Sequence, residues 1–169
     1  DDSRIRHRLE GYLFPETYAL PAESDEKELI RRMLAELDRK LGQLPEGWEQ
    51  RMEELGIDFH QLMTIASLIE REVVVDKERP LVAGVIYNRL KSGMNLEIDA
   101  TVQYALGEQK ERLLYEDLEV DSPYNTYANA GIPPGPIASP GIRSIEAALY
   151  PEESSYLFYV TKKDGTQDR

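Results

Sequence analysis

The sequence predicts a single α+β domain over residues 1–169, rich in helices, with a few short strands and a long Pro/Gly-rich loop lining a groove. Three observations predict this class. Apolar residues recur at helical spacing along most of the chain, and a β-favouring aromatic segment stands near each end. Residues 122–141 hold five prolines and three glycines. A chain of 169 residues can bury one core of its own.

Composition and charge exclude several classes of function. A formal net charge of -12 argues against a nucleic-acid partner, because phosphate binding needs a basic surface. The chain has no cysteine, and its two histidines, His7 and His60, lack metal-ligand spacing, so we expect no metal site and no organic cofactor. It has neither a run of 18 apolar residues nor a signal peptide, which indicates a cytosolic protein or a soluble piece of a larger one.

The first half of the chain predicts one extended segment and three helices. Residues 10–20 are aromatic, and Pro15 limits them to an edge strand or an extended segment. Ser24 is the expected N-cap of the first helix, and Asp58 is the expected N-cap of the third. The three helices are expected over residues 24–41, 45–56 and 59–74.

The second half predicts three more helices, over residues 78–93, 99–107 and 139–150. Between them, residues 122–141 cannot form a regular element. A loop of this length is usually functional or disordered, and its five prolines favour an ordered surface. Residues 156–162 predict a strand, followed by a turn at Asp164-Gly165. Too few residues remain for a full return strand, so the strand pairs elsewhere or the natural chain continues.

Two acids stand in the helix over residues 59–74. At about 100° per residue, Glu70 falls between Ala66 and Met63, inside the apolar arc. Glu72 falls toward the opposite edge of that arc. The pattern therefore singles out Glu70 as the acid that faces packed side chains.

Two interpretations of Glu70 stay open. In the first, its carboxylate pairs with an arginine such as Arg79 or Arg89. In the second, desolvation raises its pKa so that it holds a proton near neutral pH and serves as a general acid. Ser67, one turn earlier, could orient it or could simply be a small helix residue.

Polar residues elsewhere provide further candidates. Asn88 and Arg89 interrupt an apolar helix, as a local hydrogen-bonding pair or as part of a site. The tetrapeptide YNTY, residues 124–127, places two aromatic rings around an amide and a hydroxyl. Sugars have apolar faces and polar edges, so this set suits a carbohydrate cleft, and loop packing explains it equally well.

Six motifs follow one another along the chain: LEGYLFPETY, ASLIEREV, ERPLVAGVIYNRLKSGMNL, SPYNTYANAGIPPGPIASPG, SIEAALYP and YLFYVTKKDGT. With them the chain resembles the catalytic domain of the endolytic murein transglycosylases, the YceG-like family, over nearly its whole length. The resemblance implies a lyase that cleaves peptidoglycan between N-acetylmuramic acid and N-acetylglucosamine and leaves 1,6-anhydro ends. It implies peptidoglycan glycan strands as substrate, and cell-wall synthesis enzymes as possible partners.

Carried over residue by residue, the resemblance places the catalytic glutamate in ASLIEREV, at Glu70, acting first as acid and then as base. Glu72 is the possible second acid. The expected substrate-binding residues are Ser67, Asn88, Glu97, Tyr124, Asn125, Thr126 and Tyr127.

The chain departs from the family pattern near residue 97. The family usually has a glutamine and a proline where this chain has Glu97 and Ala100, and Glu97 would add charge to a substrate site. The family's N-terminal membrane helix and small LysM-like domain are absent from the sequence. We therefore expect a piece, soluble by itself, of a protein anchored at the extracytoplasmic face of the bacterial inner membrane.

Two rival functions remain. One is a binding module that holds glycan or an envelope partner without cutting it. The other is a hydrolase in which Glu72 or Glu97 activates water. The products distinguish the three functions. A transglycosylase leaves anhydro ends, a hydrolase leaves reducing ends, and a binding module cuts nothing.

Overall fold

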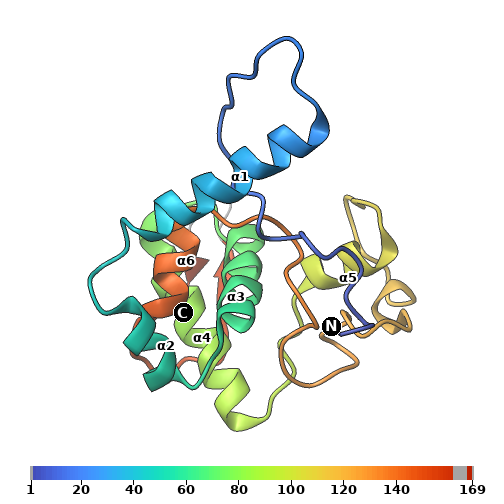
Figure 1. Cartoon of the computed structure of the whole chain (residues 1–169). Coiled ribbons are helices and arrows are strands. Elements are labelled where there is room, and N and C mark those ends of the chain that lie inside the picture. The colour runs from blue at the N-terminus through green and yellow to red at the C-terminus, as the bar shows by residue number, and fades with distance from the viewer. Residues whose placement is uncertain (1, 162–166, 169) are drawn as a thin grey trace.

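Helix α3 (Phe59–Glu72) is the central element of the computed structural model, which describes residues 2–161 and 167–168. Helices α4 (Arg79–Ser92), α5 (Asp99–Leu106) and α6 (Ile142–Leu149) all contact it. Figure 1 shows α6 and α4 on one side of α3 and α5 on the other. This arrangement buries eight consecutive residues of α3, 62–69, and leaves its last turn at the edge of the packing.

The cap residues that the sequence predicts set the ends of α3 and α4. Asp58 forms a capping box with Gln61: its side chain accepts from the Gln61 N–H at 2.8 Å, and the Gln61 side chain accepts from the Asp58 N–H at 2.9 Å. Helix α4 has Pro80 in its first turn and ends at Gly93, which has a left-handed φ of 71°. Both predicted helices are confirmed, with ends within two residues.

Helices α1 (Glu26–Leu41) and α2 (Trp48–Leu55) precede the bundle, and α1 runs along the top of the view in Figure 1. The N-cap of α1 is Asp25 rather than the expected Ser24, because the Asp25 side chain accepts from the Glu28 N–H at 2.9 Å. Two 3₁₀ turns, η1 (Asp76–Glu78) and η2 (Asp117–Glu119), complete the helical elements of the described residues.

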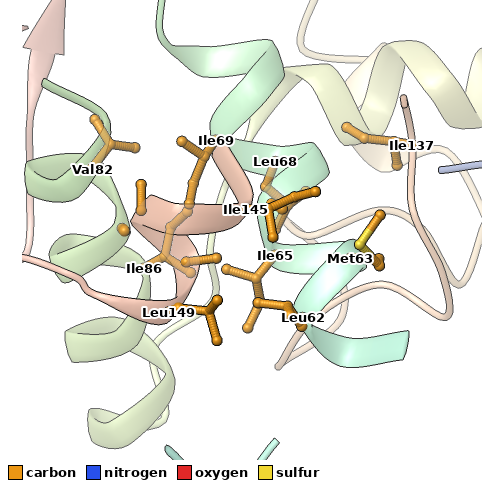
Figure 2. Packing of buried hydrophobic residues seen from close by; sticks show 14 of the residues in the cluster. Leu62, Met63, Ile65, Leu68, Ile69, Val82, Ile86, Ile137, Ile145 and Leu149 are labelled. Atoms are coloured by element: carbon orange, nitrogen blue, oxygen red, sulfur yellow. The ribbon is translucent and has the colours of Figure 1, made fainter. Parts of the chain in front are cut away.

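The core lies between α3, α4 and α6. Figure 2 shows aliphatic side chains from the three helices packed together, each at most 2% exposed: Leu62, Ile65, Ile69, Ile86, Ile145 and Leu149. Burying side chains of this size is worth about 1.5–3 kcal/mol each. The last turn of α3 is therefore held on a rigid support.

Gly84 allows α4 and the segment after α6 to approach closely. A Cβ at this position would stand 2.3 Å from the backbone oxygen of Glu152. The Glu152 N–H donates to the Pro80 oxygen at 2.8 Å, which fixes the segment against α4. Only glycine fits at this contact.

The expected α+β class is wrong, because the fold is built from helices. Residues 10–20 form no strand. The strand pairing in the described residues is limited to a two-residue antiparallel ladder, β1 (Val160–Thr161) with β2 (Gln167–Asp168). β1 thus has a short return partner within the chain, and the predicted turn at Asp164-Gly165 lies outside the described residues.

Residues 156–159, which make up most of the predicted strand, form no strand, and neither do residues 151–155 before them. Side chains, rather than a neighbouring strand, bind the backbone of this segment. Asn88 Nδ2 donates to the oxygens of Ser154 and Tyr156 at 2.8 and 2.9 Å. Arg89 Nε donates to the Leu157 oxygen at 2.7 Å. Within residues 2–161 and 167–168, no helix combines the length and the apolar character needed to cross a membrane.

Candidate active site

A groove of about 380 Å³ opens beside the last residue of α3, Glu72. Its walls come from α3, from the loop before α5 together with the first residue of α5, from the Pro-rich loop, and from residues 158–160. We call it the Glu72 groove. It is lined by Glu72, Arg89, Leu96, Glu97, Asp99, Tyr127, Phe158, Tyr159 and Val160.

The carboxyl group of Glu72 is largely removed from water. This burial raises its pKa above the ordinary value, and the nearby negative charge of Asp99 raises it further. The Tyr159 hydroxyl donates to Glu72 Oε2 at 2.6 Å and partly opposes the rise in pKa. Glu72 is therefore an acid positioned on a groove, with a pKa above its ordinary value.

Two further acids line the same groove. The Tyr127 hydroxyl donates to Asp99 Oδ1 at 2.5 Å, and this contact fixes the carboxylate at the start of α5. Glu97 has a positive φ of 53°, unusual for a residue other than glycine, and its N–H donates to the Thr126 oxygen at 3.2 Å. The groove thus presents negative charge close to the buried acid.

Arg89 joins two walls of the groove. Its Nη1 donates to the oxygens of Asn95 and Leu96, both at 3.0 Å, while its Nε binds residue 157. The guanidinium also lies 4.8 Å from the centre of the Phe158 ring. Because most of these bonds end on backbone oxygens, Arg89 mainly fixes the distance between the walls.

Phe158 and Val160 form an apolar side of the groove. They are 62% and 65% exposed, which is unusual for large apolar side chains. An exposed ring above a fixed guanidinium offers a flat surface of the kind on which the apolar face of a sugar can stack. The groove therefore combines an acid, a pair of carboxylates and an apolar platform.

The surroundings of Glu70 differ from the apolar packing that the helical pattern suggested. Its side chain is 30% exposed, and its Oε2 accepts from Arg79 Nη1 at 3.2 Å and from Ser144 Oγ at very short range. Arg79 also donates to Ser144 Oγ at 2.9 Å and to Asp76 at 2.8 Å. Glu70 is thus a member of a polar cluster that ties α3 to α4 and α6, the arginine-paired alternative.

Several of the predicted substrate-binding residues have structural contacts instead. Ser67 is fully buried, donates to the Thr64 oxygen at 2.6 Å and accepts from the Ile137 N–H at 3.1 Å, so it does not orient Glu70. Asn88 binds residues 154 and 156, as described above. Tyr124 is 3% exposed and packs its ring 4.8 Å from that of Tyr104.

Within the YNTY tetrapeptide only Tyr127 reaches the Glu72 groove. Asn125 is buried and donates to the oxygens of Leu118 and Val120 at 2.9 and 3.0 Å. Thr126 is buried and accepts from the Ile98 N–H at 2.9 Å. Of the predicted binding residues, the structure therefore brings Glu97 and Tyr127 to the groove.

Comparison with known proteins identifies the family. The sequence profile of the YceG-like family matches residues 1–168. The chain belongs to the YceG-like family. It is 44% identical over 165 residues to the endolytic murein transglycosylase of Bacillus subtilis strain 168, covering 97% of this chain and 45% of that protein. The endolytic murein transglycosylase of Streptococcus pneumoniae strain D39 is 38% identical over 164 residues, covering 94% of this chain and 29% of that protein.

This YceG-like chain also shares its fold with a solved relative. The crystal structure of a yceG-like protein from Listeria monocytogenes superposes with a TM-score of 0.91 at 41% identity, covering 99% of this chain and 54% of that one. The chain spans less than half the length of the Bacillus and Streptococcus relatives.

Sequence reasoning did not single out five residues that line the groove of this YceG-like chain: Leu96, Asp99, Phe158, Tyr159 and Val160. Asp99 is the first residue of α5, and its carboxylate accepts from the Tyr127 hydroxyl. The sequence places Phe158 and Tyr159 in a strand. No signal in the sequence links residues 158–160 to Glu72, because their proximity comes from tertiary packing.

Proposed function

We propose that this YceG-like chain cleaves peptidoglycan glycan strands as a lytic transglycosylase, with Glu72 as the catalytic acid. One observation carries the proposal: a half-buried carboxyl group with a raised pKa stands on a groove that also has an apolar wall. The names of the Bacillus and Streptococcus relatives, endolytic murein transglycosylases, support the substrate.

The reaction needs one acid that later becomes a base. Glu72 donates its proton to the oxygen that joins C1 of N-acetylmuramic acid to N-acetylglucosamine, and the C1–oxygen bond breaks. The C6 hydroxyl of the muramic acid then bonds to C1 and releases its proton to the Glu72 carboxylate. The products are a 1,6-anhydro-muramic end and a free N-acetylglucosamine hydroxyl, and Glu72 is protonated again.

The remaining groove residues have roles in the same step. Positive charge develops at C1 as the bond opens, and the carboxylates of Asp99 and Glu97 supply negative charge on that groove. Tyr127 holds Asp99 in place. Phe158 offers its face to a sugar ring, which orients the strand before bond cleavage.

Glu72 is the better acid of the two candidates in ASLIEREV. A general acid must keep its proton near neutral pH, and burial favours the protonated form of Glu72. Glu70 instead accepts from the Arg79 guanidinium and from the Ser144 hydroxyl, and it does not line the groove. In this proposal the catalytic acid is therefore Glu72, the possible second acid of the sequence analysis, and not Glu70.

Product analysis tests the proposal. Purified glycan strands are digested with the chain, and the fragments are separated and weighed by mass spectrometry. The proposal expects new ends that are 1,6-anhydro-muramic acid. Absence of any cleavage by the folded chain would support the binding module and overturn it.

Hydrolysis is the second candidate, and Asp99 is the observation that favours it. A second carboxylate on the same groove could activate water for attack at C1, as in two-carboxylate glycosidases. This route yields reducing muramic ends. If the chain is a hydrolase, Asp99→Asn abolishes cleavage. If it is a transglycosylase, Asp99→Asn cleaves more slowly but still yields anhydro ends.

The place of action follows from the substrate. If peptidoglycan strands are cleaved, the chain works in the bacterial cell envelope, at the outer face of the cytoplasmic membrane. Enzymes that synthesise new strands there are the proposed partners. Glycan cleavage in cells depleted of those enzymes measures whether the reaction depends on them.

A further inference from the structure

A second cavity, of about 420 Å³, is built from the sequence neighbours of the Glu72 groove. Arg71 lines it and precedes Glu72 on α3, and Ala100 lines it and follows Asp99 on α5. Arg6 and Gln103 also contribute to it. We call it the Arg71 cavity. Because these residues are consecutive, the two hollows lie next to each other at the contact of α3 with α5.

Two arginines on the Arg71 cavity donate to neutral oxygens rather than to the carboxylates that abound in this chain. Arg6 Nη1 donates to the Tyr104 oxygen at 2.7 Å, and Arg71 Nη2 donates to Gln109 Oε1 at 2.8 Å. Both side chains belong to exposed residues. Although Glu10 and Glu108 also line the cavity, the two guanidiniums keep N–H groups for a carboxylate ligand.

Gln103 adds a need for a hydrogen-bond donor. Its Nε2 donates to the Lys110 oxygen at 3.4 Å, whereas its buried Oε1 has no partner within the residues that the structure describes. Buried oxygens of this kind are rare unless a ligand or water satisfies them. The two arginines therefore favour a ligand that carries carboxylates.

We propose that the Arg71 cavity binds the stem peptide of the strand whose glycan lies in the Glu72 groove, an inference that rests on the proposed function. A stem peptide carries both amide N–H groups and carboxylates, and it branches from the muramic acid at which cleavage occurs. Three extended residues of a stem peptide span roughly 10 Å, and the linings of the two hollows meet at the consecutive pairs Arg71–Glu72 and Asp99–Ala100. The substrate class is therefore glycan that still carries its peptides.

Matched substrates test the charge requirement. One preparation of glycan strands keeps its stem-peptide carboxylates, and a second has them converted chemically to amides. We expect kcat/KM to be about tenfold higher on the first, the factor that one charge-assisted contact provides. Arg6→Gln and Arg71→Gln should bring the ratio of the two rates close to one, while Arg31→Gln, at an exposed site on α1, should leave it unchanged.

The ratio isolates binding from chemistry. Arg71 lies beside Glu72 and lowers the pKa of its carboxyl, so Arg71→Gln affects the rate on every substrate. That common factor cancels between the two preparations. Equal rates of the unaltered chain on both, or an unchanged ratio in both variants, would overturn the inference while leaving glycan cleavage intact.

Binding of the isolated stem peptide gives a readout independent of cleavage. Titration calorimetry should detect its binding to the unaltered chain and to Arg31→Gln, with a loss of about tenfold in Arg6→Gln and Arg71→Gln. If no glycan is cut but the peptide binds in this pattern, the proposed function fails and the peptide site stands. If glycan is cut but no peptide binds, the site fails alone.

Discussion

The hydroxyl of Tyr159 lies 2.6 Å from Glu72 Oε2 and donates a hydrogen bond to it. This bond connects the segment after α6 to the end of α3, and it stabilises the ionised form of the acid. Burial acts in the opposite direction and is the larger effect. Burial and the Tyr159 hydrogen bond are thus the two largest influences on the pKa of Glu72, and they act in opposite directions.

Removing the hydroxyl of Tyr159 should raise the pKa of Glu72 further. In Tyr159→Phe the limb of the pH–rate profile on which activity falls with rising pH should move to higher pH, because the acid keeps its proton longer. Glycan cleavage measured from pH 4 to pH 9 checks this. A limb at the same pH as in the unaltered chain would show that Glu72 is not the titrating acid.

The buried acid should make stability depend on pH. Below the ordinary pKa of Glu72 both folded and unfolded chains hold the proton, so burial of the carboxyl costs no ionisation energy. As the pH rises from that ordinary pKa to the raised pKa of the folded chain, the folded chain loses about 1.4 kcal/mol of stability for each pH unit. Glu72→Gln should therefore stabilise the chain more at pH 8 than at pH 4, as measured by urea unfolding. An equal effect at both values contradicts the raised pKa.

Glu70→Gln should act on stability rather than on the acid. Arg79 is 9% exposed and would lose one of its two carboxylate partners, which predicts a loss of about 1 kcal/mol at pH 7. The partial exposure of Glu70 keeps this value at the low end. Urea unfolding of this variant, with and without high salt, measures it; a gain in stability would argue against the ion pair.

Phe158 should contribute to glycan binding. Phe158→Ala removes the exposed ring of the groove and should raise KM by about tenfold with little change in kcat, because the ring acts before bond cleavage. Tyr115, which is 91% exposed and outside the groove, provides a matched control as Tyr115→Ala. Equal KM values for the two variants would remove Phe158 from the site.

The tight contact at Gly84 should be intolerant of any side chain. Gly84→Ala places a methyl group 2.3 Å from the Glu152 backbone oxygen, so the chain should lose about 2 kcal/mol. At Gly42, whose φ of −64° suits alanine, the same change should be nearly neutral or stabilising. Thermal unfolding of both variants compares them directly, and a neutral Gly84→Ala would contradict the close approach.

The helices could be predicted because their signals are local. Asp58, Gly93 and Gly107 mark helix ends through their own backbone preferences, and those ends agree with the structure within two residues. The strand over 156–162 could not be predicted correctly. Its aromatic alternation is present, but Asn88 and Arg89, distant in sequence, bind its backbone oxygens in place of a paired strand.

The sequence pointed to the segment ASLIEREV, and the acid that we propose from the structure, Glu72, is not the one that the helical pattern singled out, Glu70. The helical pattern placed Glu70 inside one apolar arc and Glu72 toward its other edge. Which edge meets a groove depends on what packs there, and that is tertiary information. Arg79 and Ser144 cover the Glu70 edge, whereas the Glu72 edge opens to the groove.

The rates of Glu72→Gln and Glu70→Gln on the same glycan strands test the central claim most directly. With both variants shown to be folded by circular dichroism, Glu72→Gln should lose at least about a hundredfold in kcat, the usual contribution of a general acid. Glu70→Gln should keep most of its activity. Retained activity in Glu72→Gln together with loss in Glu70→Gln would contradict the assignment and return the catalytic role to Glu70.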